Sequence, residues 1–457
     1  MWPERKSNRS RPAQERAAFR CASGVTRSGW TSAERFRLFP VVRLPRRHLT
    51  FLQRASETNN APQQGKGEDD MSFMRNCAWA VGALAAAGFA TSAATADDIK
   101  LPGTLVVTAY DVGSSGYSQM VGLGSILKNN YGTNVRVLPG KNDVSRLGPV
   151  KAGRAQFTAT GSDSVYAQEG VFTFGTRDWG PQPLRIHLLA IGKGAAVGMV
   201  TPGDKSIETM DQIKGKRVAW IRGAPALNKA VEAMMACFGV GWDDVEKVEF
   251  GGHGPAVDGF INDEVDALNN ATFSALNKKI EASPRGIHYP VVPNDPQCWE
   301  RLNAVVPWYL PTFATVGTGM AEGGQWMANT PYPILVSNPD VEAETSYSIV
   351  KAMDTHFDTF KDTAPGAAGW AMENQQFHKL LPYHEGAIKY FKEVGVWPEG
   401  QDEIQAGSLK RQDVLRTAWA TYVKDAPEDD EAFNKGWMKA RADALEAAGM
   451  TVIFYEW

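Results

Sequence analysis

Residues 104–116 read TLVVTAYDVGSSG, a strand that runs into a Gly/Ser loop. Residues 104–110 have the β-branched and apolar character of a buried strand. The segment after the loop, 117–129, has apolar residues at helical spacing from Met120 to Leu127. A Gly/Ser loop in this position brings backbone N–H groups to the N-terminus of a helix, where anionic groups bind readily.

The same alternation continues along the chain. Strands are expected over 134–138 and 156–160, with a helix over 143–152 between them and another helix that begins at Ser162 or Asp163. The order β-α-β-α-β-α with short loops predicts a parallel sheet with helices on both faces. Further strands at 186–192 and 198–201 are expected to complete this first lobe.

A second unit opens near residue 206 and repeats this architecture. A short helix ends at Gly215, a strand follows over 217–221, and the loop 222–225 leads into a helix over 226–238. Further strands are expected at 248–250 and 267–270, with a helix over 256–262 between them. We therefore expect an α/β protein whose two lobes face each other, with loops and helix N-termini around one cleft.

The last part of the chain is expected to be helical and structural. Amphipathic helices rich in Ala, Lys and Glu are expected over 341–360, 377–394, 408–423 and 428–448. Such helices suit the outside of a lobe.

Residues 71–96 read MSFMRNCAWAVGALAAAGFATSAATA and are typical of a secretory signal peptide. Arg75 gives a positive start at Met71 or Met74, 78–90 form the apolar run, and cleavage is expected before Asp97. The apolar run is too short for a membrane span, and no run of 18 or more apolar residues occurs later in the sequence. The sequence predicts an exported, periplasmic protein, which excludes cytoplasmic metabolism, chromatin and integral membrane proteins.

Residues 1–70 precede this signal and have two interpretations. They are either a basic tail for an anionic partner or the translation of an upstream start codon, and we favour the second. The expected organisation is 1–70 outside the fold, 71–96 signal peptide, 97–202 first lobe, 203–315 second lobe, and 316–457 a return to the first lobe plus C-terminal helices.

The charge of the exported part argues against nucleic acid as a partner. Residues 1–96 hold 15 of the 48 Lys and Arg residues but only 7 of the 51 Asp and Glu residues, which leaves a formal net charge of −11 on the other 361 residues. An acidic exported chain has no electrostatic footprint for nucleic acid or for anionic lipid, and no stable membrane insertion is expected.

Motifs for catalysis, metal or nucleotide are not found after residue 96. There is no G-x-S-x-G, no P-loop and no C-x-x-C or H-x-x-x-H spacing, so we expect no enzyme activity, no cofactor and no metal. The stretch 251–254, which contains His253, is interpreted as a turn rather than an oxyanion loop. Cys237 and Cys298 either form a disulfide or remain buried thiols.

Four sequence segments, in order and with suitable gaps, resemble the TAXI-type solute-binding proteins of TRAP transporters. The similarity extends from about Leu105 to Trp397 and includes a G-x-x-G loop at 113–116 with Gly122, the run RLGPVKAGRAQF at 146–157 followed by SDSVY at 162–166, the segment 207–218, and PYHEGAIKYFKEVG at 382–395. The resemblance implies a two-lobed fold of the type 2 periplasmic-binding-protein kind, with hinge strands. It also implies a small carboxylate-bearing solute and delivery to a membrane permease driven by an ion gradient.

The sequence departs from the TAXI pattern at two loops where the ligand should bind. Residues 118–120 read SQM where the family has Tyr-Tyr-Pro, and 222–228 read RGAPALN where it has a Gly-Ser-Gly-Thr loop. The usual ligand of the family therefore does not transfer directly. A periplasmic sensing module and an exported hydrolase remain alternatives.

The expected ligand contacts come from both lobes. Arg222 is expected to pair with a carboxylate, and Tyr166 and Trp220 to stack on or shape the ligand. The full expected set is Gly113, Ser114, Ser115, Gly116, Asn142, Ser162, Asp163, Tyr166, Trp220, Arg222, Gly223, Asn228, Asn269, Asn270 and Thr272.

Overall fold

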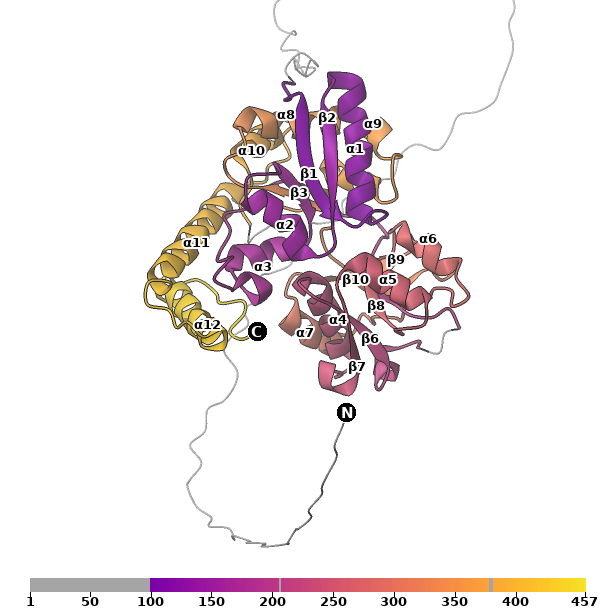
Figure 1. The fold of residues 1–457 in the computed structure, drawn as a ribbon. Helices are drawn as coiled ribbons and strands as arrows, with labels where there is room; N and C mark the ends of the chain where they lie inside the picture. The colour runs from indigo at the N-terminus through magenta and orange to yellow at the C-terminus, as the bar shows by residue number, and fades with distance from the viewer. Residues whose placement is uncertain (1–98, 205–206, 378–380) are drawn as a thin grey trace, which may run out of the picture. The chain divides into compact units, whose positions relative to one another are not determined.

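A computed structural model describes residues 99–204, 207–377 and 381–457. The expected signal peptide and the segment before it lie outside the described residues. The described chain forms two lobes, each with its own sheet and flanking helices, followed by C-terminal helices (Figure 1). No helix within these ranges is long and apolar enough to cross a membrane.

The first lobe is built on a five-stranded mixed sheet in the order β2-β1-β3-β11-β4. Strand β1 pairs in parallel with β2 and β3, whereas β11 is antiparallel to β3 and β4. The strands are β1 (Thr104–Tyr110), β2 (Asn134–Gly140), β3 (Phe157–Thr160), β4 (Arg185–Leu189) and β11 (Ile334–Ser337). The helices are α1 (Ser115–Tyr131), α2 (Asp143–Lys151), α3 (Asp163–Glu169), α8 (Ala343–Thr355), α9 (Phe357–Phe360) and α10 (Glu385–Glu393), with 3-10 turns at Phe172–Phe174, Ala367–Trp370 and Met372–Asn374.

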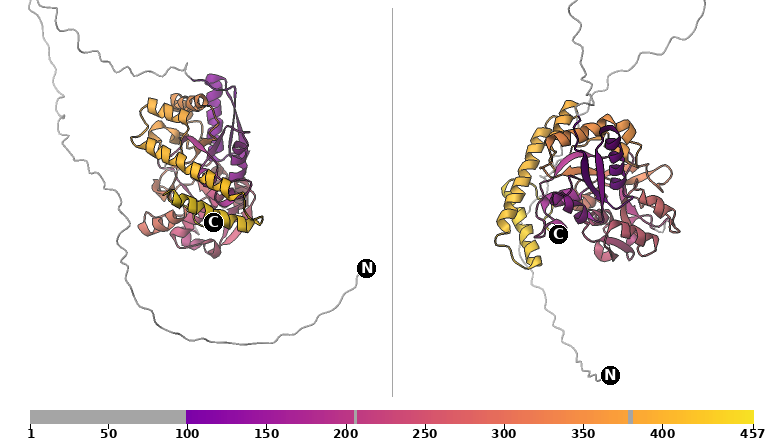
Figure 2. Two further views of the ribbon diagram at one scale, coloured as in Figure 1. Left: turned by 90° about the vertical axis from the view of Figure 1, so that its left-hand side faces the viewer. Right: turned by 45° about the horizontal axis from the view of Figure 1, so that its top comes forward.

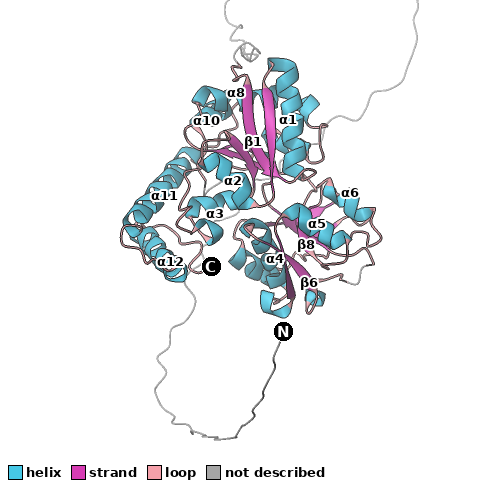
Figure 3. Cartoon of the chain, in the orientation of Figure 1, coloured by secondary structure: helices cyan, strands magenta, loops and turns pink. Residues whose placement is uncertain are grey.

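The second lobe contains a four-stranded antiparallel sheet in the order β8-β5-β10-β9 and a parallel pair, β6-β7. An isolated parallel bridge between Val218 and Ala267 connects the two. Figure 3 labels β6 and β8 among the strands of this lobe. The strands are β5 (Val197–Val200), β6 (Arg217–Ile221), β7 (Glu246–Phe250), β8 (Leu268–Ala271), β9 (Leu310–Ala314) and β10 (Gln325–Asn329). The helices are α4 (Pro225–Cys237), α5 (His253–Ile261), α6 (Leu276–Glu281) and α7 (Pro296–Val305), with 3-10 turns at Met210–Ile213 and Trp242–Asp244.

The expected α/β fold with two lobes and additional C-terminal helices is confirmed, but two strands lie in a different lobe from the one expected. The strand expected at 198–201 is β5, which pairs with β8 and β10 and belongs to the second sheet. Strand β10 lies there too, so the chain returns to the first sheet only after residue 329, not at 316. The four-stranded second sheet is antiparallel, whereas a mostly parallel sheet was expected. The position of β5 depends on pairing with strands that are distant in the sequence, and no local sequence pattern indicates those partners.

The chain crosses between the lobes twice, after β4 and after β10, and the two crossings lie side by side. The N–H of Ala190 donates to the carbonyl of Pro333 at 2.8 Å, and the N–H of Tyr332 donates back to Ala190 at 2.8 Å. This pair of hydrogen-bonded segments forms the connection between the lobes.

The C-terminal helices α11 (Gln401–Tyr422) and α12 (Asp430–Ala447) pack against each other and flank the first lobe (Figure 2). They are tied to α3 by a buried ion-pair cluster. The Glu169 carboxylate accepts hydrogen bonds from the Arg411 guanidinium at 2.6 and 2.8 Å and from Arg441. Burial opposes ionisation of Glu169, but the two arginines outweigh it and lower its pKa.

Cys237 and Cys298 form a disulfide that joins the end of α4 to α7. Of the two alternatives left open by the sequence, the structure has the bridge. It lies within the second lobe and is buried, so it holds that lobe together.

Candidate functional site

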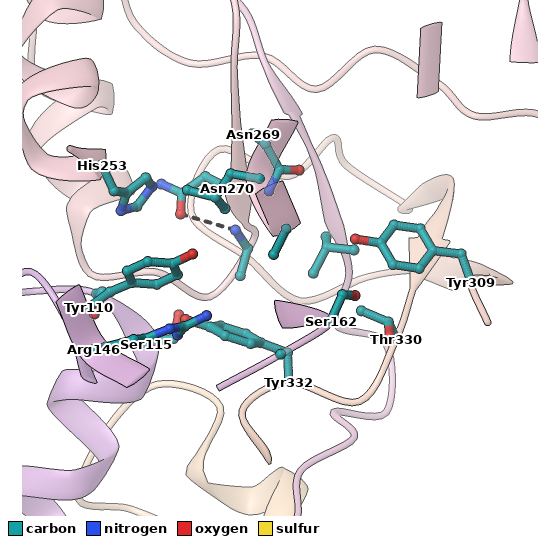
Figure 4. Close-up of a pocket in the computed structure, with 16 residues that line it drawn as sticks. Tyr110, Ser115, Arg146, Ser162, His253, Asn269, Asn270, Tyr309, Thr330 and Tyr332 are labelled. Atoms are coloured by element: carbon teal, nitrogen blue, oxygen red, sulfur yellow. Dashed lines mark hydrogen bonds between the residues drawn. The ribbon is translucent and has the colours of Figure 1, made fainter. Parts of the chain in front are cut away.

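The two lobes enclose a cavity of about 50 Å³. The lining residues are Tyr110, Ser114, Ser115, Arg146, Gly161, Ser162, Val197, Ala226, Leu227, His253, Asn269, Asn270, Ala271, Tyr309, Thr330 and Tyr332. Figure 4 shows Tyr110, Arg146 and Tyr332 on one side of this space and His253 with the two asparagines on the other.

The first lobe contributes the start of α1 and the ends of its parallel strands. Ser114 is the N-cap of α1, and its hydroxyl accepts from the N–H of Tyr117. Ser115, the first residue of the helix, is buried, and its Oγ has no hydrogen-bond partner among the described residues. A buried hydroxyl without a partner costs free energy, on the order of 1–3 kcal/mol.

Arg146 is the one cation that lines the cavity, and its donors are already engaged. Its guanidinium pairs with Asp163 (Nε–Oδ2 3.0 Å, Nη2–Oδ1 2.6 Å) and Asp143 (Nη2–Oδ1 3.3 Å), and it donates to the carbonyl of Ala159 at 2.9 Å. The guanidinium also interacts with Tyr332 and lies over the Tyr110 ring, with Cζ 3.6 Å from the ring centroid. Burial alone would lower the pKa of Arg146, but Asp163 and the other anionic partners raise it above its ordinary value. Arg146 therefore holds the wall of the cavity and has no free pair of donors for a carboxylate.

Asp143 lies beside Arg146 and reaches into the second lobe. One of its oxygens accepts from the Tyr110 hydroxyl, and the other accepts from the N–H of Ala226 at 2.8 Å. Burial, followed by repulsion from Asp163, raises the pKa of Asp143 to about 7 in spite of Arg146. Burial also raises the pKa of Tyr110 well above its usual range, so this phenol remains a neutral donor.

The second lobe contributes His253, Asn269 and Asn270. His253 is the first residue of α5, and neither of its ring nitrogens makes a hydrogen bond of ordinary geometry with a described residue. Burial lowers its pKa to about 4, and Asp111 together with the backbone of Asn269 offsets only part of that, so the imidazole is neutral. A neutral imidazole offers one donor and one acceptor. Asn269 Oδ1 is likewise buried and unpartnered, whereas the Asn270 side chain is bound to Asn277.

Residues of the second crossing, together with Tyr309, complete the lining of the cavity. Thr330 and Tyr332 belong to the second crossing, and Tyr309 precedes β9. The Trp308 indole donates to Ser162 Oγ at 2.9 Å, which joins the lobes at this side of the cavity. Burial raises the pKa values of Tyr309 and Tyr332, so both remain protonated.

Five of the residues expected from the sequence line this cavity: Ser114, Ser115, Ser162, Asn269 and Asn270. Several others lie next to the cavity and support it. Asp163 pairs with Arg146, and the Gly116 N–H donates to the Tyr332 hydroxyl. Asn142 caps α2, and its side-chain amide also donates to the carbonyl of Arg222, next to Gly223. Gly113 adopts a positive φ of 88° in the loop before α1, a conformation suited to glycine.

The remaining expected residues lie away from the cavity. Arg222 is the main correction, because its side chain is 76% exposed and pairs with Glu249, so it does not meet a solute in the cavity. Tyr166 packs in the core of the first lobe, and Trp220 packs edge-on against Trp242. The two other expected residues have structural hydrogen bonds, Asn228 to the backbone of Ile221 and Thr272 to Ala196 and Val316.

Sequence reasoning missed the residues that depend on distant segments. Arg146 falls inside a quoted motif, but its spacing alone does not distinguish a buried arginine from a surface one. His253 was interpreted as part of a turn, and Tyr309, Thr330 and Tyr332 lie where no element was assigned. A histidine directly after two glycines, at the start of a helix, was the signal available for His253.

The fold and the cavity define a two-lobed α/β protein with a small enclosed site between its lobes. The sequence profile of the NMT1-like family matches residues 108–395, so the chain belongs to the NMT1-like family. No curated protein sequence matches the chain significantly.

Solved structures similar to this chain include three binding proteins. An ancestral arginine-binding protein bound to glutamine is 14% identical, with 58% of this chain and 97% of that chain covered and a TM-score of 0.36. An amino acid ABC transporter substrate-binding protein from Streptococcus pneumoniae, bound to L-arginine, is 13% identical, with coverages of 57% and 96% and a TM-score of 0.33. The alkanesulfonate-binding protein from Xanthomonas axonopodis, bound to MOPS, is 14% identical, with coverages of 66% and 96% and a TM-score of 0.34. Identities and TM-scores this low identify neither a ligand nor a partner for this chain.

Proposed function

We propose that this chain is an extracytoplasmic solute-binding protein, which encloses a small organic acid between its lobes and delivers it to a membrane permease of the TRAP type. The observation that carries the proposal is a pair of buried polar atoms on opposite sides of one cavity, Ser115 Oγ and Asn269 Oδ1, which have no hydrogen-bond partner among the described residues. The His253 ring lies beside them, and its nitrogens make no hydrogen bond of ordinary geometry with a described residue. A solute that bonds to both lobes would satisfy these groups and stabilise the enclosed state.

The cavity favours a compact acid that is held without a free cation. Ser115 is the first residue of α1, so a helix N-terminus with positive partial charge borders this space. Hydroxyl groups and the N-terminus of α1 replace Arg222 as the proposed carboxylate contacts. The small volume favours an acid with few non-hydrogen atoms over a long-chain or two-ring ligand.

The groups that line the cavity give less support to a hydrolase. A serine nucleophile requires a hydrogen bond to its base, and Ser115 Oγ and the His253 ring nitrogens make no such bond with each other. The TRAP permease, the periplasmic location and the signal peptide rest on the sequence resemblance. A sensing module would use the same cavity and differs only in its partner.

The first experiment is a thermal-shift screen of the purified chain against short monocarboxylates, dicarboxylates, keto acids, amino acids and neutral polyols. A solute that binds only the folded state raises the melting temperature with dose. Hits are then measured by calorimetry with Ser115→Ala, which should weaken binding about two- to tenfold through one lost hydrogen bond. Ser125→Ala, on a more exposed turn of the same helix, is the matched control and should bind as the wild type does.

The delivery step has its own test. Deletion of the gene should abolish cellular uptake of the identified acid, and collapse of the ion gradient should abolish uptake in the intact strain. Uptake that continues without the gene would favour the sensing alternative. Chemical conversion of a bound solute would favour the hydrolase, and hits confined to neutral solutes would refute the organic-acid assignment.

A further inference from the structure

Helices α4 and α5 of the second lobe both begin at the cleft, and neither has a cap of its own. The N-cap positions are Ala224 and Gly252, and neither provides a side-chain cap hydrogen bond. The first N–H groups of a helix have no partner inside it and are normally satisfied by an N-cap side chain. The caps of these two helices must therefore come from elsewhere.

The first lobe supplies them. Asp143 Oδ2 accepts from the N–H of Ala226 at 2.8 Å in the first turn of α4. Two acceptors meet the first turn of α5: the carbonyl of Lys141 accepts from the N–H of His253 at 2.8 Å, and Asp111 Oδ2 accepts from the N–H of Gly254 at 2.8 Å. A carboxylate at a helix N-terminus also interacts favourably with the helix dipole.

Among the described residues, five other helices carry a side-chain cap of their own: α1, α2, α7, α10 and α12. Ser114 caps α1, and Asn142 forms a capping box with Ser145 at the start of α2. In the second lobe itself, Asp295 caps α7 by accepting from the N–H groups of Gln297 and Cys298. Helices α4 and α5 instead receive their acceptors from the opposite lobe.

Two glycines allow the lobes to approach closely enough for this capping. A Cβ at Gly252 would lie 2.7 Å from Lys141 Cβ and 3.0 Å from its carbonyl oxygen. A Cβ at Gly254 would lie 2.9 Å from Asp111 Oδ2. In contrast, a Cβ at the neighbouring Gly251 would meet nothing within 4 Å, so the restriction follows the interlobe contact.

The α4 cap is also connected to the cavity wall. Asp143 accepts from Tyr110 and Arg146 in addition to Ala226, and both of these side chains line the cavity. A movement that separates the lobes would therefore disturb the wall of the cavity as well as the cap.

We propose that Asp111 and Asp143 are positioning residues that cap α5 and α4 across the cleft, so that closure of the lobes is favoured before any solute binds. Parting the lobes leaves the first N–H groups of both helices without these acceptors. The inference goes beyond the proposed function, because it concerns the two lobes and holds whichever solute binds.

Asp111→Ala on the full chain, without solute, is the main test. Asp111 is partly exposed, and its carboxylate accepts a hydrogen bond from the N–H of Gly254. Its removal should therefore disturb the fold less than removal of the buried Asp143. Loss of one cap should raise the exchange rate of the His253 and Gly254 amides about fivefold, measured by hydrogen exchange. The radius of gyration from small-angle X-ray scattering should rise together with it.

Two variants separate closure from general stability. Asp111→Asn keeps an acceptor oxygen and should restore the wild-type exchange rate and radius. Asp295→Ala removes a cap of the same type inside the second lobe, and should lower the melting temperature without changing either readout. Unchanged exchange at residues 253–254 in Asp111→Ala, or an equal expansion in Asp295→Ala, would overturn the proposal.

Gly252→Ala provides a test that leaves every hydrogen-bonding side chain in place. Its φ of 180° is accessible to alanine, so the new methyl group conflicts only with Lys141 across the cleft. We expect expansion for Gly252→Ala and the wild-type radius for Gly251→Ala. Equal radii for the two variants would contradict the interlobe capping. Because no solute is present, this result is independent of whether a solute is ever found.

Discussion

Acid should weaken this protein through His253, and the structure gives the size of the effect. Burial lowers the pKa of this histidine from 6.5 to about 4, so the folded state favours the neutral ring. A base whose pKa is depressed in the folded state stabilises the fold above its unfolded pKa, and that contribution is lost as the pH falls from about 6.5 to about 4. At 1.36 kcal/mol per unit, the full loss is about 3.4 kcal/mol, of which roughly 2 kcal/mol should be lost by pH 5.

The assay is urea unfolding of the wild type and of His253→Gln at pH 7.5 and pH 5. His187 is also buried, and its pKa is lowered well below its usual value, while burial acts in the opposite direction on Asp143. Both groups are present in both proteins, so their contributions cancel in the difference between the two pH dependences. The wild type should lose roughly 2 kcal/mol more than the variant between the two pH values.

A matched control distinguishes burial from a general effect of histidine removal. His356→Gln makes the same substitution at a partly exposed histidine that bonds to Tyr131, so it measures the effect of a histidine-to-glutamine change away from the cavity. If His253→Gln and the wild type lose the same free energy of unfolding between pH 7.5 and 5, then His253 is not held neutral by burial and the reasoning fails.

Two further predictions concern stability. Replacement of Cys237 and Cys298 by serine should lower the free energy of unfolding by roughly 4 kcal/mol, because the bridge closes a loop with a sequence separation of 61; equal urea midpoints for the two proteins would contradict this. Glu169→Gln leaves two buried arginines without their carboxylate and should cost about 3–5 kcal/mol by the same assay. Its control, Asp443→Asn, breaks an exposed pair and should change the free energy of unfolding by less than about 1 kcal/mol.

Local patterns in the sequence were sufficient for most of the elements that carry the site. The strand at 104–110 and the strand at 217–221 have the expected bounds, and the helix after the Gly/Ser loop begins two residues before the expected one. These segments are determined by alternation, helical spacing and capping residues within about a dozen positions. For the same reason, the Gly/Ser loop at the start of α1 indicated Ser114 and Ser115 correctly as residues of the cleft.

Elements whose place depends on distant partners could not be assigned in this way. Strand β5 lies in the second sheet because it pairs with β8 and β10, and no feature of residues 197–200 records those partners. Arg222 follows a strand at the expected position, but its long side chain turns outward to Glu249. A loop can be placed near a cleft from its neighbours, whereas the direction of a flexible side chain depends on charges supplied by other strands.

The sequence by itself determined an α/β chain of two lobes with helix N-termini directed at a cleft, because strand and helix periodicity and loop composition are local properties. Only the tertiary structure decided which groups face the cavity. It buried Arg146 between two carboxylates, left His253 neutral, and made the caps of α4 and α5 depend on the opposite lobe. Burial and hydrogen-bond satisfaction are sums over residues far apart in the chain, so they exist only once the two lobes have come together.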